Sequence, residues 1–346
     1  MRSYNAIKQA MNWGWAIAAS VASFAMSAVG TRVVLGHLRA RDILDHPNER
    51  SSHAVPTPRG GGIAVLAAVL PIWALIAIFG PGSSHNAFLP ISAALVLAFV
   101  SWRDDIGGLS ARARFAVHIG AVAVGLMAFL SRGPIFPLLL PLWLDRLAAG
   151  FAWLWFLNLF NFMDGIDGIT GAETAAIGIG AGIVALLIPA DVDALYGLSI
   201  AAAALGFLLW NWHPAKIFMG DVGSVPLGYL LGWLLLDLAS HGAWAPALIL
   251  PLYYLADATL TLLSRLARGE RIWQAHREHF YQRAVRGGLS HARVVQAILL
   301  ADVILIGLAY WSVPSSPLPF MQLALAILVV VLLLGFLGTR RPEAAR

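Results

Sequence analysis

The feature that most constrains this chain is a series of apolar runs, each long enough to cross ~30 Å of hydrocarbon as a helix. Hydrophobic residues make up 59% of its 346 residues and charged residues only 12%, about half the charged share of an ordinary soluble domain. A soluble protein of this length could not bury so much apolar surface, so lipid must surround most of it. We therefore predict an all-α integral membrane protein with about eleven transmembrane helices. The runs cover residues 11–34, 61–80, 87–102, 113–131, 146–163, 173–190, 194–212, 222–240, 243–264, 292–312 and 317–338.

Composition also excludes several classes of function. The chain has no cysteine, which excludes disulfides, thiol catalysis and cysteine-ligated metals. The net charge of +5 suggests nucleic acid binding at first sight, but an arginine excess in a membrane protein is better explained as an orientation signal. We expect no nucleic acid partner. The first run, with Lys8 ahead of it, resembles a signal peptide, yet ten further runs follow, so we expect an uncleaved anchor.

Positive charge falls on alternate connections between the runs. Of the 23 lysines and arginines, 18 lie after the first, third, seventh and ninth runs or in the C-terminal tail. Because positive charge stays on the inner side of a membrane, these connections and the C-terminus are predicted to be cytoplasmic and the N-terminus to lie outside. No linker, soluble module or repeat interrupts the chain, so residues 1–346 are predicted to form one membrane domain. A series of glycines at 178, 180 and 182 fits close helix packing better than a phosphate loop, because no strand precedes it.

Chemically unusual residues gather on the same predicted inner side, beginning with the loop from Asp45 to Gly62. Its prolines and three consecutive glycines predict an irregular segment that a ligand can approach closely, and Arg59 could meet a phosphate. The alternative is a basic loop that faces lipid headgroups.

A pair of adjacent carboxylates, Asp104 and Asp105, ends the third run. Neighbouring carboxylates repel each other and raise the pKa of one of them unless they share a cation or a proton. The pair suits a site that handles Mg²⁺ or removes a proton from a phosphate. The alternative is a solvated pair that closes a helix.

The most distinctive motif runs from Asn161 to Gly171. Its aspartates, Asp164 and Asp167, stand three residues apart and would share one face of a helical turn. No lysine or arginine lies in this connection, and two uncompensated carboxylates at the mouth of a membrane helix are costly unless a cation binds. Ligands that are all oxygen indicate a hard ion such as Mg²⁺.

A fourth motif runs from Asn211 to Ser224. Asp221 stands beside glycines, as expected where a phosphate and a metal must approach the backbone. Lys216 is one of only two lysines and would supply a mobile point charge to a diphosphate. Phe218 could stack on a base, although packing in the core is the alternative.

The fifth motif is the histidine loop, residues 276–283. His276 and His279 would share a helical face, but no third zinc ligand of the usual kind is near in sequence. Hydrogen bonds to a phosphate or sugar, made together with Arg277, fit the surrounding positive charge better. The alternative is an amphipathic helix that lies on anionic lipid.

These five motifs, in this order across residues 45–283, resemble the polyprenyl-phosphate N-acetylhexosamine-1-phosphate transferase family. That family includes the enzymes that initiate O-antigen, enterobacterial common antigen and teichoic acid, and the phospho-MurNAc-pentapeptide transferase of peptidoglycan synthesis. The resemblance implies transfer of a sugar-1-phosphate from a UDP-sugar to undecaprenyl phosphate, with release of UMP. It further implies dependence on Mg²⁺, or Mn²⁺ in its place, and an active site on the cytoplasmic face of the bacterial inner membrane.

The resemblance also implies roles for the motif residues. Asn161, Asp164 and Asp221 would hold the metal ion, and Asp104 and Asp105 would orient or deprotonate the lipid phosphate. Arg59 and Asp164 would contribute to binding of the donor. Its nucleotide would be contacted by Asp167, Asn211, Lys216 and Phe218. Its sugar-phosphate would be held by His276, Arg277 and His279. The histidine loop departs from the His-x-His-His pattern of the common-antigen and peptidoglycan branches and resembles the branch that initiates O-antigen or capsule chains. That branch includes enzymes that use 6-deoxy-N-acetylhexosamines such as FucNAc or QuiNAc, so the donor sugar stays open, as do a homodimer and a covalent aspartyl intermediate.

Other membrane functions make different demands on the sequence. A transporter or flippase for a lipid-linked sugar would place polar residues near mid-membrane on broken helices, where Asp257 and Asp302 are acidic candidates. An intramembrane aromatic prenyltransferase would carry two Asp-x-x-x-Asp-like motifs in related halves, which this sequence does not show.

Overall fold

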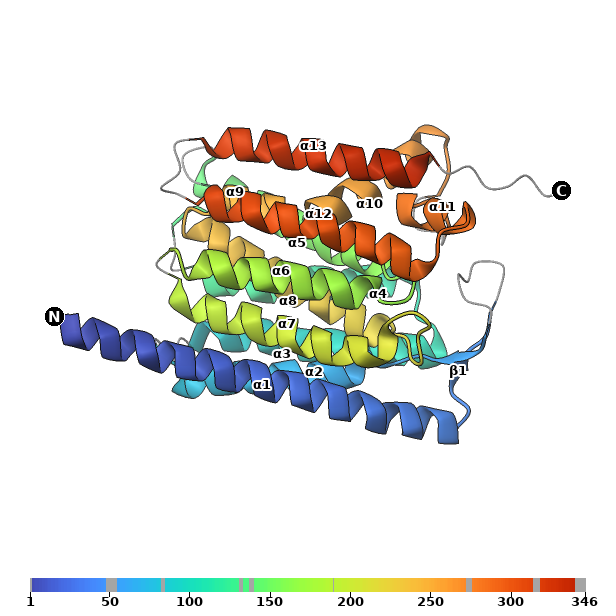
Figure 1. The fold of residues 1–346 in the computed structure, drawn as a ribbon, viewed down its shortest axis with the longest axis horizontal. Helices are drawn as coiled ribbons and strands as arrows, with labels where there is room; N and C mark the ends of the chain where they lie inside the picture. Colours follow the sequence, from blue (N-terminus) through green and yellow to red (C-terminus); the bar gives the residue numbers. More distant parts are fainter. Residues whose placement is uncertain are drawn as a thin grey trace.

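The computed structural model describes residues 2–47, 55–81, 85–130, 133–136, 140–188, 190–271, 276–313 and 318–339, so residues 48–54 of the predicted first loop lie outside the described part. Long helices lie side by side in one bundle (Figure 1). Seven of the described helices are long and apolar enough to cross a membrane, which confirms an all-α fold of membrane type. The number eleven and the orientation stay predictions.

Each predicted run corresponds to one helix except the ninth, which forms two. The helices are α1 (Arg2–Ala40), α2 (Gly62–Phe79), α3 (Phe88–Gly107), α4 (Ala111–Leu126), α5 (Leu142–Phe162), α6 (Ile169–Ala185), α7 (Asp191–Asn211), α8 (Asp221–Ser240), α9 (Trp244–Ile249), α10 (Leu252–Ala267), α11 (Phe280–Arg286), α12 (His291–Trp311) and α13 (Pro319–Gly338). Short 3₁₀ turns η1 (His85–Ala87) and η2 (Met127–Phe129) and strands β1 (Leu44–Asp45) and β2 (Thr57–Pro58) complete the described elements. The ninth run breaks between α9 and α10 at Pro251, which has no N–H to continue the helical ladder.

The centre of the bundle is α8. Its residues from Val222 to Ala239 are buried, and it packs against α3, α5, α2 and α9. Outer helices instead expose large apolar side chains, for example Val33 on α1 and Leu332 on α13. Lipid is as apolar as these side chains, so their exposure costs nothing in a membrane.

Helices α6 and α7 approach closely through glycines. A Cβ built on Gly178 would lie 2.7 Å from the carbonyl oxygen of Gly197, closer than a real side chain allows. Gly182 likewise faces Leu198 and the backbone of Ala194. The interpretation of this glycine series as helix packing is therefore confirmed.

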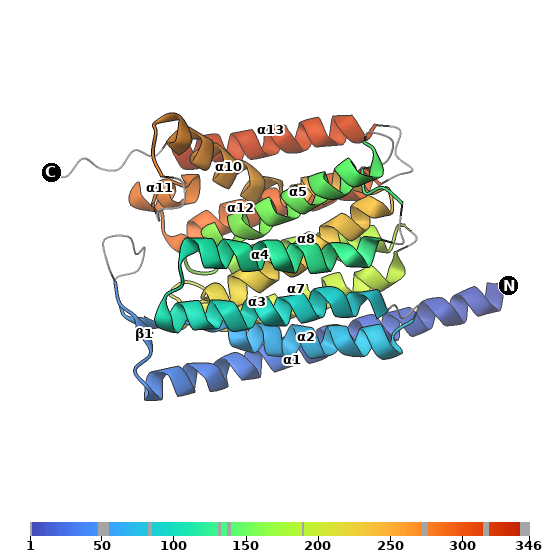
Figure 2. The same ribbon diagram turned by 180° about the vertical axis from the view of Figure 1, so that it is seen from behind.

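One end of the bundle collects the polar connections, and we call it the polar end. It carries β1, β2, α11 and the connections that follow α1, α3, α5, α7 and α10, whereas the N-terminus lies at the other end (Figures 1 and 2). Contacts between these connections bring the separated motifs together, as the parallel bridge between Arg59 and Phe218 shows. The five motifs therefore meet at a single end of the fold.

Candidate active site

The first loop docks directly onto the start of α8. The amides of Gly60 and Gly61 donate to the carbonyl of Phe218, and the amide of Gly62 donates to Met219 at 2.9 Å. A Cβ on Gly62 would lie 2.2 Å from the Cα of Gly223, so only glycine fits. We expected these glycines to admit a ligand, but those at 61 and 62 admit another segment of the chain itself, and this contact sets the position of Arg59.

Arg59 joins two of the predicted catalytic carboxylates. Its Nη2 lies 2.6 Å from Oδ1 of Asp221 and 3.2 Å from Oδ1 of Asp105. Gly220, with a φ of 75°, lets the chain turn so that Asp221 becomes the first residue of α8. The side chain of Arg59 is 41% exposed, so solvent reaches this ion pair.

Asp104 faces a second arginine. Its Oδ2 lies 3.0 Å from Nη1 of Arg114, and the same Nη1 is 4.0 Å from Oδ2 of Asp221. The tight turn between α3 and α4 also lets the amide of Leu109 donate to Asp104, while Ser110 caps α4 through its side chain. The adjacent aspartates therefore bind different arginines, and both arginines approach Asp221.

The third motif lies beside this group. Ser224, one turn into α8, donates its hydroxyl to Oδ1 of Asn161 at 2.6 Å. Thr170 donates to Oδ1 of Asp164, also at 2.6 Å. Burial, together with the nearby carboxylates of Asp221 and Asp105, raises the pKa of Asp164 to about 6, against the opposing effects of the Thr170 bond and Arg59.

The donor atoms of this group suit Mg²⁺. Asp105, Asp164 and Asp221 supply carboxylate oxygens and Asn161 an amide oxygen, which are the hard ligands that this ion takes. The positive guanidinium of Arg59 lies between two of these carboxylates, where their combined charge attracts a cation. A metal ion could share or replace that contact because the arginine is partly exposed.

A cavity of about 880 Å³ opens against the same residues, between α3, α4, α5 and α8. One part of its lining is polar and the other apolar. The polar part includes Asp104, Arg112, Arg114, Asn161 and Asp221, and the apolar part includes Leu97, Val100, Phe115, Phe162 and Val225. Within it, Nδ1 of His118 lies 3.0 Å from Oδ1 of Asn158. Such a lining suits a ligand with a charged head and an apolar tail.

Three of the predicted nucleotide contacts, Asn211, Lys216 and Phe218, lie in different surroundings. Asn211 is buried, and its side-chain amide binds the backbone: Oδ1 accepts from the amide of Gly168 at 3.0 Å and Nδ2 donates to the carbonyl of Ile217 at 2.9 Å. Lys216 is exposed, with Nζ 5.4 Å from the ring of Trp210. Phe218 is fixed through its backbone, which donates to Pro58. Direct contact of these side chains with a nucleotide stays a prediction.

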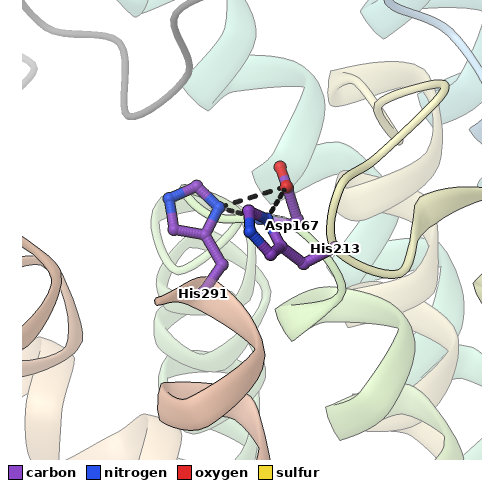
Figure 3. Close-up of side chains that lie close together, drawn as sticks. All are labelled: Asp167, His213 and His291. Carbon is purple, nitrogen blue, oxygen red and sulfur yellow. Dashed lines mark hydrogen bonds and ion pairs between the residues drawn. The ribbon is translucent and has the colours of Figure 1, made fainter. Parts of the chain in front are cut away.

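Asp167 meets two histidines from distant parts of the chain (Figure 3). Its Oδ2 lies 2.6 Å from Nδ1 of His213 and 3.2 Å from Nδ1 of His291, and the amide of Ala215 donates to the same oxygen. Burial raises the pKa of Asp167, but the bonds to His291 and His213 lower it more, so the net shift is downward. The carboxylate is held in its charged form.

The histidine loop is anchored by an aspartate of α10. Oδ1 of Asp257, whose side chain is fully buried, lies 3.2 Å from Nδ1 of His279 and accepts from the amide of Phe280. Burial, followed by the charges of His279 and Arg265, lowers the pKa of His276 to about 4, so this imidazole is neutral at pH 7. Its Nδ1 accepts from the amide of Glu278, which leaves Nε2–H as a donor. Arg277 is partly buried beside them.

Four residues at the polar end were not predicted from the sequence to belong to the site: Arg114, His213, Asp257 and His291. His213 lay inside the fourth motif, and Asp257 had drawn notice only as an acidic residue in a predicted span. His291 gave a local signal as the first residue of α12 after the capping Ser290. Nothing in the sequence linked it to Asp167, 124 positions away.

Comparison with known proteins agrees with this arrangement. A family model described as glycosyl transferase family 4 matches residues 87–239, which include the carboxylates from Asp104 to Asp221. A decaprenyl-phosphate N-acetylglucosaminephosphotransferase of Mycobacterium leprae (strain TN) is 30% identical over 319 residues, covering 82% of this chain and 79% of the relative. The chain belongs to this family of polyprenyl-phosphate N-acetylhexosamine-1-phosphate transferases.

Two further relatives extend the family 4 match to nearly the whole chain. The protein of the same description from Mycolicibacterium smegmatis (strain ATCC 700084 / mc(2)155) is 28% identical, covering 87% of this chain and 83% of the relative. An undecaprenyl-phosphate alpha-N-acetylglucosaminyl 1-phosphate transferase of Escherichia coli O157:H7 is 26% identical, covering 88% of this chain and 86% of its own length. The similarity therefore includes the first loop and the histidine loop as well as the carboxylates.

Proposed function

We propose that this chain transfers an N-acetylhexosamine-1-phosphate from a UDP-sugar to undecaprenyl phosphate in a bacterial inner membrane. The observation that carries the proposal is the cavity beside Asp104 and Asp221, because its polar head and apolar wall match a lipid phosphate. The relatives named above act on undecaprenyl or decaprenyl phosphate. The positive charge at the polar end supports a cytoplasmic site and an N-terminus outside, and the eleven apolar runs of the sequence support eleven crossings of the membrane.

The reaction is a phosphoryl transfer. An oxygen of the lipid phosphate attacks the sugar-side phosphorus, the bond from that phosphorus to the bridging oxygen breaks, and the electron pair leaves with UMP. Positioning and charge compensation supply most of the catalysis in such reactions. Mg²⁺, held by Asp221 with Asn161 and Asp164, would neutralise charge on the diphosphate.

Residues of the chain supply the remaining parts. Arg114, which lines the cavity, would bind the acceptor phosphate, and its bond to Asp104 fixes that guanidinium. Asp105, held by Arg59, would orient the attacking phosphate or accept its proton. His276 would donate its Nε2–H to the sugar-phosphate, since its Nδ1 is already used by the chain.

Purified protein given undecaprenyl phosphate, Mg²⁺ and a panel of UDP-N-acetylhexosamines tests the proposal by release of UMP. The panel should include GlcNAc and the 6-deoxy sugars FucNAc and QuiNAc, because the histidine loop resembles the branch that initiates O-antigen chains. We expect release with at least one donor. No release with any donor, while a known family member works in the same assay, would refute the transferase.

One observation favours transport of a lipid-linked sugar instead. Glu173 of α6 and Asp302 of α12 are both buried and interact with each other within the helical bundle. Carboxyl groups buried among membrane helices often mark a proton or substrate pathway. A flippase would move a fluorescent lipid-linked sugar across vesicles without releasing UMP, so the same preparation distinguishes the two functions.

A further inference from the structure

We propose that His213 and His291 are positioning residues for the nucleotide half of the donor, acting through Asp167. This inference rests on the proposed function and deepens it. It begins from a geometric fact: three segments far apart in sequence, the turn after α5, the connection before α8 and the start of α12, meet at one carboxylate oxygen (Figure 3).

Asp167 does not belong to a helix or strand. The residue lies in an irregular segment between α5 and α6, flanked by Gly165 and by Gly168, whose φ is 80°. What holds the carboxylate is therefore the set of groups at Oδ2: Nδ1 of His213, Nδ1 of His291 and the amide of Ala215. A charged hydrogen bond of this kind is about twice as strong as a neutral one.

The arrangement uses only one of the two carboxylate oxygens. Among the described residues, the hydrogen bonds and ion pairs of the Asp167 side chain are all made by Oδ2. Oδ1 is thus left to accept from an N–H or hydroxyl of a ligand, which a nucleoside offers. Asn211, which binds the amide of the adjacent Gly168, keeps the backbone of the same turn in place.

The second histidine adds a connection to the sugar-phosphate side. His291 is the first residue of α12, five positions after the last residue of α11. Its Nδ1 lies 3.3 Å from the amide nitrogen of Asp167 and 3.2 Å from Oδ2, and its tautomer decides whether it accepts from the amide or donates to the carboxylate. Because α12 contacts α11, which follows His276 and His279, His291 links the turn that carries Asp167 to this part of the molecule. Both histidines therefore act on the donor without being placed in contact with the reacting atoms.

Hydrogen bonds from the two histidines and the amide of Ala215 to the side chain and backbone of Asp167 explain these contacts without a metal ion. The two imidazoles and the carboxylate do form a set that could hold a transition metal, since their ligand atoms lie within 4.8 Å of one another. However, 2.6 Å between Oδ2 and Nδ1 of His213 is a short hydrogen bond, and Nδ1 of His291 has a hydrogen-bonding partner in Asp167 in either tautomer. We therefore assign the cluster to positioning and treat zinc binding as an outcome of the test.

The test replaces each histidine by alanine, asparagine and glutamine in the full-length protein. An asparagine amide reaches the same distance from Cβ as Nδ1, whereas a glutamine amide reaches the position of Nε2. His213→Ala and His291→Ala should raise the KM for the UDP-sugar by about tenfold to a hundredfold, the loss of one charged hydrogen bond, with the KM for undecaprenyl phosphate unchanged. Asparagine should restore most of the loss and glutamine little of it.

The matched control is His241→Asn, because His241 also bonds an aspartate, Asp237, but lies at the other end of α8. Direct binding of UMP, measured by calorimetry, distinguishes a failure of the proposed transferase function from a failure of the inference about His213 and His291. Failure of the wild type both to bind UMP and to turn over any donor refutes the proposed function. Wild-type binding that the alanine variants share unchanged refutes only this inference.

Two other results would also overturn it. One is a fall in thermal midpoint with both KM values rising together and no rescue by asparagine, which indicates a purely structural role. The other is loss of wild-type activity with a zinc chelator in excess Mg²⁺, restored by Zn²⁺, which indicates a metal site.

Discussion

Two buried or half-buried carboxylate sites lie at the same end of this molecule and are built in opposite ways. Asp221 and Asp105 meet the long, partly exposed side chain of Arg59. Asp257 is enclosed by short, fixed donors: the amides of Phe280 and Tyr281, two hydroxyls and the imidazole of His279. A carboxylate whose partner can move is available to a ligand, while one surrounded by backbone amides is part of the scaffold.

The largest effect is expected from Asp221→Asn. Losing one metal-binding charge should lower kcat for UMP release by about a thousandfold or more, a size typical of removing transition-state charge stabilisation. The thermal midpoint should hardly change, because partly exposed ion pairs contribute only ~0–1 kcal/mol. Asp42→Asn, an exposed aspartate at the same end, is the control and should behave as wild type. Equal activity of the two variants would remove Asp221 from the mechanism.

The opposite pattern is expected from Asp257→Asn. The amide nitrogen that replaces one oxygen cannot accept from the α11 amides, so a buried donor loses its partner at a cost of about 1.5–3 kcal/mol. The thermal midpoint in detergent should fall clearly, and activity should recover in part at lower temperature. A variant with the wild-type midpoint and a thousandfold lower kcat would show that Asp257 belongs to the chemistry instead.

A smaller effect is expected from Arg59→Lys. The charge remains between Asp105 and Asp221, but lysine is one bond shorter than arginine and its ammonium cannot reach the position of Nη2, so we expect kcat to fall by about tenfold. Arg39→Lys, on an exposed arginine near the end of α1, provides the matched control. If Arg59→Lys is as damaging as Asp221→Asn, the guanidinium itself and not only its charge is required.

The smallest effect is expected from Glu173→Gln. Glutamine keeps the size and polarity of the side chain, and Glu173 lies outside the carboxylate group around Asp221, so UMP release should stay within about twofold of wild type. The transport hypothesis expects this substitution to abolish lipid movement. Measuring release and vesicle transport on the same variant decides which function the buried pair serves.

Features of the fold that depend on neighbouring residues in the sequence were predicted well. Apolar runs located the helices because lipid demands long uninterrupted hydrophobic segments, and alternating arginines indicated which connections share one end. The break at Pro251 was not predicted, because hydropathy alone does not show that the ninth run forms two helices, α9 and α10. The motifs likewise led to Asp104, Asp105 and Asp221, which the structure brings together.

The partners of these residues could not be predicted in the same way. Arg59 lies 162 positions from Asp221, and His291 lies 124 from Asp167, so only the packed helices bring them together. The glycines of the first loop illustrate the same limit. Their small size was evident, but whether a ligand or the backbone of Gly223 occupies the space depends on tertiary structure.

The most direct test of the account is the dependence of UMP release on a divalent cation, measured for the wild type and for Asp221→Asn side by side. We predict no release after chelation, saturable recovery with Mg²⁺ for the wild type, and at most a trace of recovery for the variant at any Mg²⁺ concentration. Full turnover of the chelated wild type, or the same Mg²⁺ curve for both proteins, would contradict the assignment of Asp221 to a metal-dependent phosphosugar transfer.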